Sequence, residues 1–232
     1  MSSSYGTPGG RVQAAVRGIL VAAAGMAMIW ATMPNRAEAA EPKPVKIVAL
    51  GDSLTAGLGV PAEAAFPARL AAVLKAKGQS VEIVNAGVSG DTASGGLARV
   101  DWSVQDGTDA VIVELGANDA LRGIDPKVTR AALDSILKKL KARNIPVLLA
   151  GMRAPRNMGP DYAREFDAIY PELAQQHGAI LYPFFLNGVA TEAKLNQPDG
   201  IHPTAAGIDV IVSRILPQVE ALIADVRKRQ GG

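Results

Sequence analysis

The sequence contains no cysteine, and this absence excludes disulfide bonds, thiolate nucleophiles and cysteine-ligated metals. Histidine is scarce as well, because the whole chain has only His177 and His202, so any imidazole chemistry must use one of these two positions. Aromatic residues make up 4% of the chain, which is few for a site that binds polysaccharide. After residue 45 there is no repeat, low-complexity tract or basic patch. The composition therefore gives no reason to expect a nucleic-acid partner.

The chain does have enough apolar residues for one substantial core. With 232 residues, of which 48% are hydrophobic, it is expected to form a single domain. We place this domain at residues 45–227, after a short extended lead-in at residues 40–44 that contains two prolines.

The amino-terminal segment has the pattern of a secretory signal. Arg11 and Arg17 precede an uncharged run over residues 18–35, and the small-x-small site Ala37-Glu38-Ala39 follows. We predict a signal peptide over residues 1–39, cleaved after Ala39, and a periplasmic or secreted mature protein. The alternative is an uncleaved anchor, although 18 uncharged residues are barely enough to cross a bilayer.

Without residues 1–39 the chain carries equal numbers of acidic and basic side chains. The basic isoelectric point of about 8.9 therefore belongs largely to the signal segment, and no affinity for polyanions follows from it.

Hydrophobic periodicity predicts strands alternating with helices. Short apolar runs indicate strands, and the spacing of leucine and isoleucine between them indicates helices. Because the second run alternates as an edge strand does, we predict an α/β three-layer sandwich with a five-stranded, mainly parallel sheet in the flavodoxin-like order 2-1-3-4-5. The predicted strands lie at about 45–50, 81–85, 109–115, 146–150 and 179–182, and the helices at about 67–77, 92–104, 126–140, 162–176 and 204–222.

Ser53 lies where the first strand must turn into a helix, in the segment Gly51-Asp52-Ser53-Leu54. A serine at such a turn projects from the carboxyl edge of the sheet, where open α/β folds bind ligands. The alternative is a serine that only caps a helix. Asp52 reads as a turn former, and Glu114, inside an apolar strand, is expected to need a hydrogen-bond partner.

His202 is the better placed of the two histidines. It lies in Asp199-Gly200-Ile201-His202-Pro203, just before the last helix, where a tight turn can bring Asp199 back onto the imidazole. A serine hydroxyl needs such a base, and the base needs a carboxylate that fixes its tautomer. The alternative is an Asp-Gly turn with a helix-capping His-Pro. His177, at the end of an amphipathic helix, reads as a solvated residue without a catalytic role.

Acyl transfer also requires donors for the developing oxyanion. The backbone amides of Ser53 and Gly90 and the side-chain amide of Asn118 are the three candidates, because the predicted topology brings their loops to the same edge of the sheet. Taken singly, Gly90 is an ordinary loop glycine and Asn118 a former of Asx-turns.

Four segments in order resemble the conserved blocks of the GDSL or SGNH hydrolases. Gly51-Asp52-Ser53-Leu54 is similar to the signature, and the other three blocks resemble those that supply the glycine, the asparagine and the histidine with its carboxylate. The resemblance covers residues 45–225 and is greatest to the periplasmic thioesterase I branch. Ala117 departs from the pattern of that branch, which often has glycine at this position. These other blocks are Ser89-Gly90-Asp91-Thr92, Gly116-Ala117-Asn118-Asp119 and Asp199-Gly200-Ile201-His202-Pro203.

The resemblance implies a serine hydrolase of carboxylic esters and thioesters, with arylesterase and lysophospholipase activity. It implies Ser53, Asp199 and His202 as the catalytic residues, Ser53, Gly90 and Asn118 as the oxyanion hole, and neither a metal nor a cofactor. We expect the acyl group to lie in an apolar groove between the 116–123 and 152–162 loops.

We expect the partner to be a small-molecule or lipid acyl ester, with membrane contact only through the signal segment or a lipid substrate. The sequence does not indicate an oligomeric state. One alternative is an O-acetyl esterase or acetyltransferase acting on carbohydrate. Another is a non-catalytic periplasmic binding domain, although such a domain has no need of a serine, histidine and aspartate set.

Overall fold

The computed structural model describes residues 1–4, 6 and 43–231. The predicted signal segment lies almost wholly outside these residues, and so does the predicted cleavage site. Within the described residues, no helix combines the length and the apolarity that crossing a membrane requires.

Residues 43–231 contain a five-stranded sheet in the order β2-β1-β3-β4-β5, with every neighbouring pair parallel. This confirms the predicted fold class and strand order. Strand β3 is buried along its whole length and β1 along nearly all of it, whereas β2, at the edge, is at best half-buried. The strands are β1 (Val45–Gly51), β2 (Val81–Gly87), β3 (Ala110–Glu114), β4 (Val147–Ala150) and β5 (Ile180–Tyr182).

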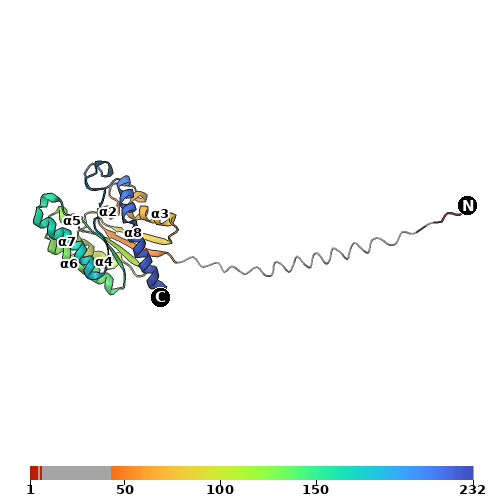
Figure 1. Ribbon diagram of the computed structural model, residues 1–232, viewed down its shortest axis with the longest axis horizontal. Helices are drawn as coiled ribbons and strands as arrows, with labels where there is room; N and C mark the ends of the chain where they lie inside the picture. The colour runs from red at the N-terminus through yellow and green to blue at the C-terminus, as the bar shows by residue number, and fades with distance from the viewer. Residues whose placement is uncertain (5, 7–42, 232) are drawn as a thin grey trace. The chain divides into compact units, whose positions relative to one another are not determined.

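Helices cover both faces of the sheet (Figure 1). Helices α3 and α8 pack together on one face, and α4, α6 and α7 pack together on the other. The five long helices are α3 (Phe66–Ala76), α4 (Ala93–Ser103), α6 (Pro126–Ala142), α7 (Pro160–His177) and α8 (Ala205–Gln230). Two short helices were not predicted, α2 (Ser53–Ala56) and α5 (Ala117–Leu121), since four or five residues are too few to show periodicity.

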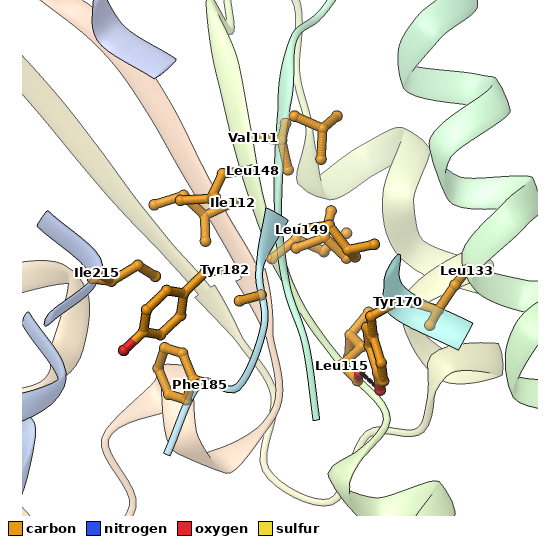
Figure 2. Packing of buried hydrophobic residues seen from close by; sticks show 14 of the residues in the cluster. Val111, Ile112, Leu115, Leu133, Leu148, Leu149, Tyr170, Tyr182, Phe185 and Ile215 are labelled. Atoms are coloured by element: carbon orange, nitrogen blue, oxygen red, sulfur yellow. Dashed lines mark hydrogen bonds between the residues drawn. The ribbon is translucent and has the colours of Figure 1, made fainter. Parts of the chain in front are cut away.

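The core beneath the carboxyl edge of the sheet contains buried aromatic side chains, Phe166 and Tyr170 among them. Figure 2 shows Tyr170 of α7 beside Leu115, the residue that follows β3, and the Tyr170 hydroxyl donates to the Leu115 carbonyl at 2.9 Å. The next residue, Gly116, has a φ of 113°, and a Cβ there would overlap the Tyr170 hydroxyl. Only glycine therefore fits at this turn, which sets the position of the loop that carries Asn118.

Candidate active site

Ser53 is the first residue of α2, and only Asp52 separates it from the end of β1. Asp52 caps this short helix, because its Oδ1 accepts from the Leu54 backbone amide at 3.0 Å. A Cβ at Gly51 would overlap the Thr55 side chain, so a bulkier residue would push α2 away from the strand. The turn leaves Ser53 7% exposed, which is enough for its hydroxyl to line a cavity.

His202 joins Ser53 to Asp199 in one hydrogen-bonded chain. The Ser53 Oγ lies 2.9 Å from His202 Nε2, and His202 Nδ1 lies 2.7 Å from Asp199 Oδ2. Because the carboxylate accepts the Nδ1 proton, the neutral ring keeps its lone pair on Nε2, facing the serine hydroxyl. The expected return of Asp199 onto the His202 ring is therefore present.

The Asp199 carboxylate is held in place by backbone amides as well. Its Oδ1 accepts from the amides of Ile201 at 2.9 Å and His202 at 3.0 Å. The His202 backbone bond, followed by the His202 ring and the Ile201 amide, lowers the pKa of Asp199 to about 2. The carboxylate is consequently charged at any pH at which the protein would act.

Asn118 and Gly90 approach the same edge of the sheet on separate loops. Asn118 Nδ2 donates to the Asp91 carbonyl at 3.0 Å and to Asp52 Oδ2 at 3.2 Å. Gly90 has a φ of 85°, and its carbonyl accepts from Arg122 at 2.9 Å. Both hydrogens of the Asn118 amide thus have acceptors in the protein, and an oxyanion would have to replace one of them.

A cavity of about 660 Å³ opens beside Ser53 and His202. The 116–123 and 152–162 loops contribute to its wall, as expected. A third wall was not predicted: it comes from the long segment between β5 and α8, through Phe184, Leu186 and Ala190. Within this segment the Asn196 side chain donates to the Val189 carbonyl at 2.7 Å, which closes the loop on itself.

Arg99, on α4, is a buried residue that sequence reasoning missed. Its guanidinium donates to the Gly51 carbonyl at 2.7 Å, to the Ala86 carbonyl at 2.8 Å and to Asp91 Oδ2 at 2.6 Å. It therefore ties together the ends of β1 and β2 and the loop of Gly90. The one signal in the sequence was a charged residue on the apolar face of a helix, next to Val100.

His177 lies elsewhere, and the prediction that it is solvated is wrong. Its side chain is 7% exposed, and Nε2 lies 2.7 Å from Asp134 Oδ1 on α6. The residue ends α7 just before β5 begins, at the amino edge of the sheet and away from Ser53. The helix–helix contact between α6 and α7 accounts for its burial.

Among the described residues, no three histidine or acidic side chains are grouped as a metal site would require.

Residues 49–210 match the model of the GDSL-like lipase/acylhydrolase family. The chain belongs to this family. An arylesterase of Vibrio mimicus is 41% identical over 159 residues, which are 68% of this chain and 80% of that protein. The thioesterase 1/protease 1/lysophospholipase L1 of Escherichia coli K12 is 41% identical over 179 residues, or 76% of this chain and 84% of that protein.

Among solved structures, the SGNH-hydrolase family esterase AlinE4 is 46% identical, with a TM-score of 0.66, over 78% of this chain and 97% of AlinE4. The resemblance to the GDSL or SGNH hydrolases, and with it the prediction of an enzyme that hydrolyses ester bonds, is confirmed.

Proposed function

We propose that Ser53 is the nucleophile of this ester hydrolase, His202 its general base and Asp199 the group that orients the imidazole. The observation that carries this assignment is the continuous chain from Ser53 Oγ through His202 to Asp199, with 2.9 Å and 2.7 Å contacts. Nucleophile, base and orienting carboxylate in this relation are the parts that acyl transfer through serine requires.

The reaction then follows in two halves. Ser53 Oγ attacks the acyl carbon while its proton passes to His202 Nε2, and the bond to the alcohol or thiol breaks as His202 returns the proton to the leaving group. Water attacks the acyl-serine in the same way, giving its proton to His202. The carboxylic acid leaves and Ser53 recovers its proton. No metal or redox partner enters the balance.

The oxyanion of each tetrahedral intermediate is proposed to bind the amides of Ser53 and Gly90 and the Asn118 side chain. In support, the carbonyl of Gly90 is fixed by Arg122, while Asn118 Nδ2 reaches across to Asp91, the neighbour of Gly90. Donors held in place in this way stabilise the charge that develops in the transition state, with Asn118 exchanging its bond to the Asp91 carbonyl for one to the oxyanion.

We propose acyl esters and thioesters with an extended apolar acyl chain as substrates, lysophospholipids among them. The support is a largely apolar cavity that begins at Ser53 and continues past Leu121 and Met152 to Phe184. The names of the relatives, arylesterase and thioesterase/lysophospholipase, are consistent with this class.

The p-nitrophenyl ester series from acetate to palmitate tests this substrate class. We expect kcat/KM to rise with acyl chain length as long as each added methylene contacts the apolar wall of the cavity. The rise is up to about fourfold per methylene, because burying one methylene contributes about 0.8 kcal/mol. Phe184→Ala should lower kcat/KM for the longer esters and leave acetate unchanged. Trp102→Ala is the matched control, since Trp102 is 66% exposed and lies outside the cavity wall.

If kcat/KM is highest for the acetate ester, the result favours an O-acetyl esterase or acetyltransferase acting on carbohydrate. If no ester is hydrolysed, the result favours a non-catalytic binding domain.

We also propose that the protein is exported and cleaved after Ala39. The support is the sequence pattern of two arginines, an uncharged run and a small-x-small site. The intact mass of protein recovered from the exported fraction should begin at Ala40. Recovery of chains that retain residues 11–33 would instead indicate an anchor.

A further inference from the structure

Two buried acids lie directly behind the proposed catalytic serine. Asp52 and Glu114, at the ends of the neighbouring strands β1 and β3, are both 0% exposed. The nearby guanidinium of Arg99 is already bonded to the Gly51 carbonyl and to Asp91, so it does not neutralise them. Two adjacent charges without a cation are costly in the interior, and the pair is expected to keep one proton.

The hydrogen bonds indicate where that proton lies. Glu114 Oε2 accepts from the Thr55 hydroxyl at 2.7 Å and from the Asp52 amide at 3.4 Å. Glu114 Oε1 is buried and meets no donor among the described residues. A buried carboxylate oxygen without a donor is unfavourable, whereas a protonated oxygen needs an acceptor instead.

Asp52 has the opposite pattern, since both its oxygens accept. Oδ1 accepts from the Leu54 amide at 3.0 Å and Oδ2 from Asn118 Nδ2 at 3.2 Å. Burial raises the pKa of Asp52 to about 6 and raises the pKa of Glu114 well above its usual value. Both oxygens of Asp52 have donors and one oxygen of Glu114 has none, so the proton that the pair keeps is assigned to Glu114.

The other charged and titratable neighbours do not change this distribution. Asp119 of α5 accepts from the Thr129 hydroxyl at 2.9 Å, and Tyr170 of α7 donates to the Leu115 carbonyl at 2.9 Å, so both groups already have other partners. His202 lowers the pKa of Asp52 and so favours its charged form.

We propose that Glu114 is a neutral acid that donates to Asp52, and that the Asp52 carboxylate is a positioning residue that holds the Asn118 amide for the oxyanion. The inference rests on the proposed role of Asn118. A charged acceptor holds a hydrogen more firmly than a neutral carbonyl does. Asp52 therefore retains one Asn118 hydrogen, and the other turns from the Asp91 carbonyl to the oxyanion.

Two isosteric substitutions have opposite expected results. Glu114→Gln presents a carbonyl to Thr55 and an amide to Asp52, which reproduces the protonated acid, so kcat should stay within about threefold of wild type. Asp52→Asn cannot satisfy both of its contacts. Whichever way the new amide turns, its NH₂ faces either the Leu54 amide or the Asn118 amide. We expect kcat to fall by about 10- to 100-fold, as for loss of a hydrogen bond to a charged group, with a much smaller change in KM.

A double-substitution cycle separates positioning from general destabilisation. On p-nitrophenyl butyrate, Asn118→Ala should lower kcat by about 10²- to 10³-fold. In that background Asp52→Asn should cost no more than about threefold, because the group through which it acts is gone. Thermal unfolding of each variant shows whether it is folded. Infrared spectra at neutral pH should show a protonated carboxylic acid that is absent from Glu114→Gln.

Three results would overturn the inference. They are a loss of more than tenfold in Glu114→Gln, a cost of Asp52→Asn that is equal in both backgrounds, or a spectrum without a protonated acid. If Asn118→Ala keeps wild-type kcat, the proposed oxyanion role itself fails. If Asn118→Ala lowers kcat but Asp52→Asn lowers it by the same factor with and without Asn118, the oxyanion role of Asn118 stands and only the positioning role of Asp52 fails.

Discussion

Ser53→Ala is expected to remove nearly all esterase activity, with kcat lower by about 10⁴- to 10⁶-fold, the loss found when a triad serine is removed. In the proposed mechanism the Ser53 hydroxyl oxygen is the one protein atom that forms a covalent bond to the acyl group. Its Oγ is 2.9 Å from the proposed base. The residual rate measures what the oxyanion donors and the cavity contribute without a nucleophile. Initial rates on p-nitrophenyl butyrate make the comparison.

The Ser53→Ala variant should fold as the wild type does, since it loses one hydroxyl at a residue that is 7% exposed. Its unfolding temperature should therefore change little. Ser213→Ala, on the exposed side of α8, is the matched control and should keep full activity. A folded Ser53→Ala enzyme with more than about one per cent of wild-type kcat would require a different nucleophile.

His202→Gln is expected to have an effect of similar size, because glutamine cannot take the serine proton at neutral pH. Activity of the wild type should rise with pH over about pH 6–7.5, because His202 must be neutral to accept the serine proton and because Asp52, whose pKa burial raises to about 6, must be charged to hold Asn118. The pKa of Asp199 is lowered to about 2, so this carboxylate stays charged throughout that range and does not produce the acid limb. Asp199→Asn should leave a folded but much slower enzyme.

His177→Gln separates the two histidines. It should leave kcat unchanged, because His177 lies at the amino edge of the sheet. It should lower the unfolding temperature, because His177 and Asp134 join α7 to α6 at 2.7 Å. The pH–rate profiles of the His202, Asp199 and His177 variants show which histidine is the general base. An inactive His177→Gln beside an active His202→Gln would show that the base has been assigned to the wrong residue.

Much of this site follows from the sequence because its parts stand at the ends of strands. Each of Ser53, Gly90 and Asn118 comes directly or shortly after an apolar run, and the carboxyl ends of parallel strands meet at one edge. The order of the strands followed from the alternation in β2, which marks an edge. The pairing of Asp199 with His202 could be predicted because the two residues are three positions apart, and a tight turn is enough to bring them together.

The parts of the site that the sequence did not predict depend on contacts between residues far apart in the sequence. Glu114 and Asp52 are separated by 62 positions, and only the parallel register of β1 and β3 brings them together. Nothing near Arg99 indicates that its guanidinium reaches the Gly51 carbonyl, 48 positions away. The burial of His177 likewise comes from packing against α6, which the pattern of α7 alone does not contain.

The most direct test of the central claim is covalent labelling by an alkyl phosphonate ester, followed by peptide mapping. A serine activated by His202 should displace the leaving group and carry the phosphonate as a transition-state mimic. We predict one phosphonate per chain, on Ser53, with labelling abolished in Ser53→Ala and slowed strongly in His202→Gln. A phosphonate found on any other serine, or an active enzyme that takes up none, would contradict the account.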